Sequence, residues 1–262
     1  TLKSWLTAGE DQLQVCACVM LGNLARSDEV CVMMVRDLGI HTELISILKG
    51  DTKAAVLHSV LGFLKNLAIA SDNRLRLGDA GIIPTVSRLW GYETVPQVQF
   101  SAVSICRQVI ISSIENISRL LNSLPDSDPP KTYLSLLLSL FEKTDSTPIK
   151  IEVGRIVASM CRTLSPKARE QNEASALLKL LFGEHETIAN PIGAMITQTQ
   201  WPVVRSEGWF ALALIASNPL GCRTVVDCLQ DSEVFEILEK TLTTEDAGST
   251  EVAGMSKDRD NM

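Results

Sequence analysis

The chain has 262 residues, of which 45% are apolar, 21% are charged and 5% are aromatic. This length is enough for one or two domains with a sizeable core. A formal net charge of −7 argues against a nucleic-acid-binding protein, because such proteins usually carry a basic patch. The apolar run YLSLLLSLF (133–141) is much shorter than the roughly 20 residues of a membrane span, so we expect no membrane insertion.

The chain has seven cysteines, an odd number, and no signal-peptide pattern precedes them. This is typical of free thiols in a reducing compartment. We therefore expect a cytoplasmic protein. The first residues are Thr-Leu-Lys rather than Met, and we expect the chain to be part of a longer protein. The formal charges of residues 201–262 sum to −6. We predict that residues 243–262, which are mostly polar, form a disordered acidic tail. The acidic segment 227–239 is either a solvated helix face or a docking surface for a basic tail.

The sequence repeats itself. LGNLARSDEVCVMMVRDLGIHTELISIL (21–48) aligns with LKNLAIASDNRLRLGDAGIIPTVSRLW (64–90), and SVLGFLKNLAI (59–69) aligns with SAVSICRQVII (101–111), 42 residues further on. A helical recurrence of about 40–47 residues is typical of armadillo or HEAT arrays. We therefore predict an all-α fold, an armadillo-repeat solenoid that forms a right-handed superhelix of about five repeats.

One repeat can be read in detail. Val56, Val60, Leu64 and Leu67 recur at helical spacing and predict a long helix with a buried stripe. A short helix should then end at Gly81, and another should follow Pro84. Residues 122–132 contain three prolines and predict a loop, and long helices are expected over 152–164 and 206–216. The prediction is a single solenoid over 1–242, with repeats at about 1–50, 51–93, 94–142, 143–198 and 199–242.

Catalytic patterns are absent from the sequence. There is no glycine-rich phosphate loop, and His41, His58 and His185 are scattered along the chain. Cys16 and Cys18 should point to different faces of one helix, with no second pair at zinc-finger spacing. We therefore expect no catalytic residue, metal or cofactor, and no covalent chemistry.

Polar side chains recur instead at one position of the long helices. Asn23 and Asn66 occupy matched positions, and Gln108 continues the row in the third copy. These amides either cap backbone groups of the preceding turn or face a ligand along the concave surface of the solenoid. Basic residues lie near the same stripe and are either solvated or directed at a partner: Arg26, Lys65, Arg107, Arg155 and Arg162.

Several segments, taken in order, resemble the C-terminal half of one armadillo family, the Smg-type GDP-dissociation stimulators of small GTPases. These segments are SWLTAGEDQLQVCACVMLGNLARSD (4–28), the H-x-x-L-x-x-L-x-N-L-A-I run (58–69), PQVQF (96–100) and SEGWFALALIA (206–216). The resemblance implies a guanine-nucleotide-exchange factor and chaperone for Rho- or Rap-type GTPases with a polybasic, prenylated C-terminus. We expect the chain to be a monomer. The resemblance also implies that Asn23 falls on a position that grips the GTPase, and that Ser27 stands where relatives can carry another Asn. The family's prenyl pocket and main acidic patch belong to earlier repeats, mostly absent from this chain.

The alternative is a non-catalytic armadillo scaffold or adaptor that binds an extended peptide, as catenins and importins do. Importin-type grooves place a Trp one turn before the groove Asn, where this chain has Val19 and Gly62, so a cradle for a basic peptide is disfavoured. A catenin-like groove would be basic, and Lys65, Arg107 and Arg162 leave that alternative open.

Overall fold

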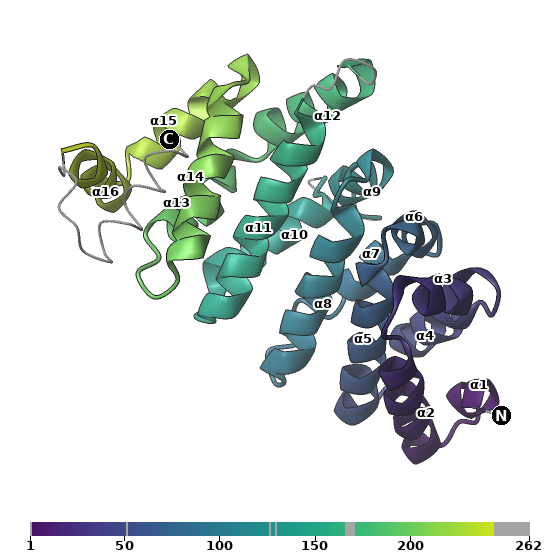
Figure 1. Ribbon diagram of the computed structural model, residues 1–262. Helices are drawn as coiled ribbons and strands as arrows, with labels where there is room; N and C mark the ends of the chain where they lie inside the picture. Colours follow the sequence, from purple (N-terminus) through teal and green to yellow (C-terminus); the bar gives the residue numbers. More distant parts are fainter. Residues whose placement is uncertain (1, 51, 126, 129, 166–170, 244–262) are drawn as a thin grey trace. The chain divides into compact units, whose positions relative to one another are not determined.

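The computed structural model describes residues 2–50, 52–125, 127–128, 130–165 and 171–243 (Figure 1). The described chain is helical throughout, apart from loops and one isolated antiparallel bridge between Ser123 and Thr132. The all-α prediction is therefore confirmed, as is the loop over residues 122–132. The last helix ends at Thr243, and the disorder predicted for the residues after it lies outside the described residues.

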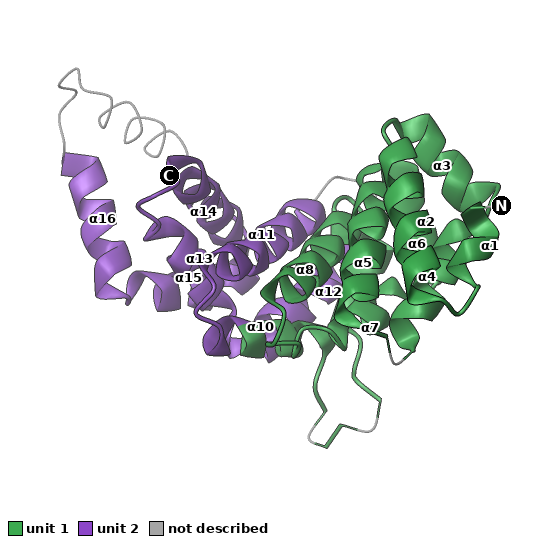
Figure 2. Ribbon diagram, turned by 90° about the horizontal axis from the view of Figure 1, so that it is seen from below, with its two compact units in different colours: residues 1–140 green, residues 141–262 purple. Residues whose placement is uncertain are grey.

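The chain divides into two compact units, Thr1–Leu140 and Phe141–Met262 (Figure 2). The first unit contains α1 (Leu2–Leu6), α2 (Asp11–Leu24), α3 (Asp28–Arg36), α4 (Ile40–Lys49), α5 (Ala54–Ile69), α6 (Ser71–Asp79), α7 (Ile82–Ser87), α8 (Pro96–Ile110) and α9 (Ile114–Leu121). The division falls within α10 (Tyr133–Lys143). The second unit continues with α11 (Thr147–Leu164), α12 (Gln171–Glu184), η1 (Glu186–Ile188), α13 (Ala189–Ile196), α14 (Pro202–Ala216), η2 (Pro219–Gly221), α15 (Cys222–Leu229) and α16 (Ser232–Thr243).

Two shorter helices and one long helix alternate along the first unit. The groups α3–α4–α5 and α6–α7–α8 follow this order, and the long helices α2, α5 and α8 pack side by side (Figure 1). In the second unit, the long helices α11 and α14 pack on each other and on α13. Each unit therefore stacks its long helices next to one another, as expected of a helical repeat array.

The long helix α5 lies between α2 and α8 and shows why the repeats stack. Its predicted stripe, Val56, Val60, Leu64 and Leu67, is fully buried. Burying one such side chain stabilises the fold by about 1.5–3 kcal/mol, and α5 cannot bury this stripe without its neighbours. The stripe prediction is confirmed.

Glycines separate the short helices. Gly81 has φ 81°, in the left-handed region, directly before α7, and Gly39 with φ 60° precedes α4 in the same way. Residues with a side chain adopt this conformation at a cost, which glycine avoids. The prediction that Gly81 would stop the short helix is confirmed.

Two buried asparagines join consecutive repeats, and the first is Asn73 on α6. Its side-chain Nδ2 donates hydrogen bonds of 2.9 Å to the carbonyl oxygens of Leu67 on α5 and Cys31 on α3. The first bond lies within one repeat and the second reaches back to the preceding one. Because Asn73 is fully buried, these bonds satisfy carbonyl groups that water cannot reach.

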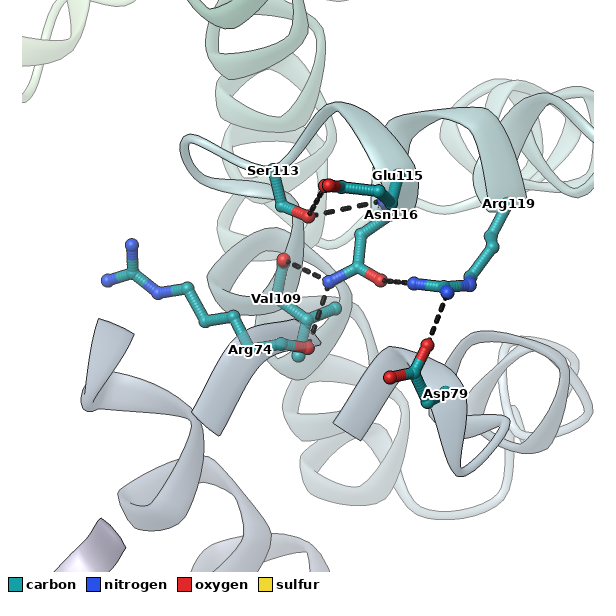
Figure 3. Close-up of polar contacts among 7 residues, drawn as sticks. All are labelled: Arg74, Asp79, Val109, Ser113, Glu115, Asn116 and Arg119. Carbon is teal, nitrogen blue, oxygen red and sulfur yellow. Dashed lines mark hydrogen bonds and ion pairs between the residues drawn. The ribbon is translucent and has the colours of Figure 1, made fainter. Parts of the chain in front are cut away.

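Asn116 on α9 repeats this arrangement one repeat later (Figure 3). Its Nδ2 donates to the carbonyl oxygens of Val109 at 2.7 Å and Arg74 at 2.9 Å. Its Oδ1 accepts a hydrogen bond from Arg119, whose guanidinium also pairs with Asp79 on α6. The cluster of Asn116 and Arg119 therefore fastens α9 to the preceding repeat.

No single helix in the described ranges is long and apolar enough to cross a membrane. One sharply bent pair, Pro202–Ala216 with Pro219–Leu229, passes the length and composition criteria only when its two helices are combined.

Candidate partner-binding surface

The row of amides predicted from the sequence lies on adjacent helices of the first unit. Asn23, Asn66 and Gln108 stand near the C-terminal ends of α2, α5 and α8, which pack side by side. Asn23 is exposed, and Asn66 and Gln108 are half-buried. All three side chains therefore reach the surface, near the same ends of three adjacent helices.

Asn66 also has a structural partner. Its Nδ2 donates a 3.0 Å hydrogen bond to the carbonyl oxygen of Gly22 on α2. The Asn66 amide therefore caps a carbonyl group of the neighbouring long helix. One of the two interpretations of the sequence expected it to cap a backbone group in the preceding turn of α5, and the structure differs from that. The bond fixes the orientation of Asn66 on a partly exposed surface.

Arg26 and Ser27 follow Asn23 and are both exposed. The Arg26 guanidinium donates to the carbonyl oxygen of Asn23 from Nε at 3.1 Å and to its side-chain Oδ1 from Nη2 at 3.2 Å. The Ser27 hydroxyl oxygen accepts the backbone N–H of Val30 at 3.4 Å and caps α3. Arg26 therefore orients the Asn23 amide, while Ser27 serves the start of the next helix.

The cation at the centre of this surface sits against an aromatic ring. Lys65 Nζ on α5 lies 5.4 Å from the centroid of Phe100 on α8. Such a contact is worth about 0.5–1 kcal/mol at a partly exposed site and limits the freedom of the lysine. Arg107, at the matched position of the next repeat, is half-buried on α8. The surface formed by Asn23, Arg26, Lys65, Asn66, Arg107 and Gln108 is called the amide row below.

The two arginines predicted further along the chain belong to the second unit. Arg155 on α11 donates from Nε to Glu207 on α14 at 2.7 Å, and its Nη1 lies 3.4 Å from the carboxylate of the buried Glu152. Burial lowers the pKa of Arg155, but hydrogen bonds and charge attraction from both carboxylates outweigh that effect and leave the pKa raised. Arg155 is therefore fixed by an internal ion pair.

Arg162, two turns along α11, lies over an aromatic ring. Its guanidinium carbon is 5.1 Å from the centroid of Phe210 on α14, and both side chains are exposed. The Arg162–Phe210 pair resembles the Lys65–Phe100 pair of the first unit, because in each a cation of one long helix covers a ring of the next. Arginine and aromatic side chains are enriched in protein interfaces, whereas lysine is not.

The positions where an importin-type groove carries tryptophan face open space. Val19 is 50% exposed, and a Cβ added at Gly62 would meet no atom within 4 Å. Neither position offers an aromatic wall beside the amide row.

Burial disfavours the thiolate form of the buried cysteines. Burial raises the pKa of Cys106 and Cys161 to about 12, and the same cause, joined at Cys228 by the charge of Asp231, raises the pKa of Cys18 and Cys228 to about 12. These groups therefore stay protonated at neutral pH. Among the residues that the structure describes, no three His, Cys, Asp or Glu side chains are grouped so that they would hold a metal ion.

Sequence reasoning missed the residues that hold this surface in place. Asn73 and Asn116 were not predicted to join repeats, although each is the third residue of a short helix and they recur 43 residues apart. That recurrence was a usable signal. The ring partners Phe100 and Phe210 and the carboxylate of Glu207 gave no such signal, because they lie one helix away from the cations that they contact.

Two known proteins are similar to most of this chain. The chain is 25% identical over 247 residues to Rap1 GTPase-GDP dissociation stimulator 1-B of Xenopus laevis, and 25% identical over 250 residues to stimulator 1-A of the same organism. Each match covers 92% of this chain and 37% of the relative, so the chain spans little more than a third of the length of these relatives. No family model matches the chain.

Solved structures with a similar fold include designed armadillo repeat proteins. One of them, in complex with the peptide (KR)4, has a TM-score of 0.71 and 17% identity over 99% of this chain and 97% of its own. Another, designed for modular peptide recognition, has a TM-score of 0.71 and 15% identity over 99% of this chain and 98% of its own. The chain therefore has the armadillo-repeat fold that its sequence predicted.

Proposed function

We propose that this chain binds a small GTPase of the Rho or Rap type through the amide row and promotes the release of GDP. The observation that carries the proposal is the alignment of Asn23, Asn66 and Gln108 at one level of three adjacent helices. Relatives at 25% identity are named as GDP dissociation stimulators of Rap1, which supports this choice of partner. In this proposal the chain acts as a monomer and is not an enzyme.

Release of GDP would need no covalent step. If the surface binds the nucleotide-free GTPase more tightly than the GDP-bound form, then by linkage it weakens GDP binding by the same factor. A thousandfold effect would require about 4 kcal/mol of differential contact energy. A few hydrogen bonds and ion pairs from the amide row are of that magnitude.

A second surface would suit a GTPase with a polybasic, prenylated C-terminus. The end of the second unit carries exposed carboxylates on and just before α16: Asp231, Glu233, Glu236 and Glu239. Clustered negative charge attracts a basic segment and speeds encounter with it, most strongly at low salt. In this proposal the α16 carboxylates guide the basic tail, and the amide row contacts the folded part of the GTPase.

The test is the rate of release of a fluorescent GDP analogue from a panel of Rho- and Rap-type GTPases, prenylated and unprenylated. The chain should accelerate release from at least one of them, and the double variant Asn23→Ala, Asn66→Ala should reduce both capture and acceleration without loss of helical content. Gln97→Ala, a change of an exposed amide at the N-terminal end of α8, should leave both unchanged. Unaltered capture and release with the double variant would refute the role of the amide row.

The same assay separates this proposal from a scaffold that binds an extended peptide. Lys65 and Arg107 on the amide row would suit an acidic peptide, as in a catenin-like groove. Binding of an acidic peptide that depends on Lys65, with no acceleration of GDP release from any GTPase of the panel, would favour the scaffold.

A further inference from the structure

Gly62 lies near the middle of the long helix α5, on its exposed side. A Cβ added there would meet no atom within 4 Å, so no neighbouring helix requires the missing side chain. A glycine inside an exposed helix destabilises it relative to alanine, because glycine loses more backbone freedom on folding. Packing within the described ranges therefore does not explain why α5 carries a glycine at this position.

The glycines of the other long helices do have a packing reason. A Cβ added at Gly22 on α2 would be 3.6 Å from the Cβ of Phe63. Added at Gly154 on α11 or at Gly208 on α14, it would come within 2.6 Å or 3.0 Å of Met195 on α13. At each of these positions the glycine lets a neighbouring helix approach closely. The open position on α5 differs from them, and it suits the approach of another molecule.

This open position lies next to the amide row. Gly62 precedes Asn66 by one turn, and the matched residue on α2 is Val19, which is 50% exposed. Lys65, one turn after Gly62, lies over the ring of Phe100 on α8. Because α5 packs between α2 and α8, the open position is flanked by an exposed apolar side chain on one side and by the Lys65–Phe100 pair on the other.

The charge carried by these three helices is positive. Asp11, at the start of α2, is the one carboxylate in α2, α5 and α8, all of whose residues the structure describes. It pairs with Lys53, which precedes α5. Lys65 and Arg107 lie on α5 and α8, and Arg26 follows α2 closely. In a chain whose net charge is −7, this surface is therefore complementary to carboxylates of another molecule.

We infer that the partner inserts a large apolar side chain, such as leucine or phenylalanine, at Gly62, and places a carboxylate beside it against Lys65. The apolar side chain packs between Val19 and the Lys65–Phe100 pair, where the absence of a Cβ lets it reach the backbone of α5. Apolar contact at the centre and charge complementarity around it are the usual division of roles in a protein interface. The inference rests on the proposed function and makes Gly62 a residue that selects partners of this chemistry.

The test measures capture of the nucleotide-free Rho- and Rap-type GTPases of the panel, truncated before their basic C-terminal segments so that the α16 carboxylates do not contribute. Gly62→Leu fills the open position and should weaken capture by at least about tenfold, which corresponds to about 1.4 kcal/mol. Gly62→Ala should weaken capture less. Neither variant should lower the melting temperature, because no atom of the chain lies within 4 Å of the added Cβ.

Gly183→Leu is the matched control. Gly183 is an exposed glycine of α12, and a Cβ added to it would also meet nothing within 4 Å, so this variant should leave capture unchanged. Lys65→Gln tests the charge of the partner surface, and it should weaken capture because a carboxylate loses its cation. Unchanged or stronger capture by Lys65→Gln would overturn the inference, since the partner would then place a neutral or basic group at this point.

The remaining outcomes separate this inference from the proposed function. Unchanged capture by Gly62→Leu, with capture lost in the double variant Asn23→Ala, Asn66→Ala, would overturn the inference and leave the proposed function intact. Capture of no GTPase of the panel by the unmodified chain would refute the proposed function, and the inference with it. If Gly62→Leu lowers the melting temperature, Gly62→Ala decides: weaker capture with a raised melting temperature supports the inference, and unchanged capture overturns it.

Discussion

Asn66 on α5 donates a hydrogen bond of 3.0 Å to the carbonyl oxygen of Gly22 on α2, 44 residues earlier in the chain. Phe63 packs on the same glycine, so a polar and an apolar contact meet at one point of the junction. Asn66 therefore joins two repeats and also forms part of the amide row. A mutation at this position will act on stability as well as on any partner, and the two effects have to be measured separately.

The first prediction separates Asn66 from Asn23. Asn66→Ala should lower the free energy of unfolding by about 1 kcal/mol, because it removes a part-buried hydrogen bond. Asn23→Ala should lower it by less than about 0.5 kcal/mol, because that side chain is exposed. Urea denaturation of both variants measures the difference. Equal losses would mean that the Asn66–Gly22 bond adds nothing to the junction.

The second prediction concerns the buried asparagine of α9. Asn116→Ala should lower the free energy of unfolding by about 2–4 kcal/mol, because two buried carbonyl groups lose their donor at once. Asn116→Asp should also destabilise, since a carboxylate cannot donate to those carbonyls. Urea denaturation measures both. A loss below about 1 kcal/mol for either variant would show that water replaces the amide.

Much of the fold follows from local pattern. Short stretches of sequence predict both the buried stripe from Val56 to Leu67 and the end of the short helix at Gly81. The structure agrees with both predictions. The proline-rich loop before α10 was also predicted from a short stretch of sequence. Helical periodicity and glycine conformation act over one or two turns, so a single sequence contains them.

The candidate site was predicted only in part, because its contacts span repeats. The sequence indicated Arg155, but not that Glu207, 52 residues later, would hold its guanidinium. It indicated Asn66, but not that its bond would reach Gly22. Such pairs depend on which turns of two long helices lie opposite each other, and packing sets that register rather than local propensity.

The third prediction compares two glycines. A Cβ added at Gly78 on α6 would lie 1.8 Å from Asn116 Oδ1 and 2.6 Å from Arg119 Nη1, so Gly78→Ala should displace that cluster and destabilise by about 3 kcal/mol or more. Gly62→Ala is the matched control, because it lies within a long helix with nothing within 4 Å. It should stabilise the chain by about 0.5–1 kcal/mol. Thermal unfolding of both variants provides the comparison, and similar shifts would contradict the close packing at Gly78.

The fourth prediction is a labelling pattern. Of the seven free cysteines, Cys16 and Cys222 are exposed, and the other five are buried. A small maleimide should therefore modify two thiols of the native chain quickly and all seven in denaturant. Mass spectrometry counts the adducts and locates them by peptide mapping. Fast modification of Cys106 or Cys161 in the native chain would contradict their burial.

The fifth prediction is a loss of stability in mild acid. Burial lowers the pKa of His185 and of His41, the latter with a further contribution from the charge of Arg76. The unfolded chain then binds these protons more tightly, so stability is complete above a pH of about 6.5 and falls as the pH drops towards the folded pKa values. Each histidine contributes a slope of at most about 1.4 kcal/mol per pH unit. Urea unfolding between about pH 7 and 5 measures the slope, which His41→Gln together with His185→Gln should reduce. An unchanged slope in the double variant would show that other groups set the acid sensitivity.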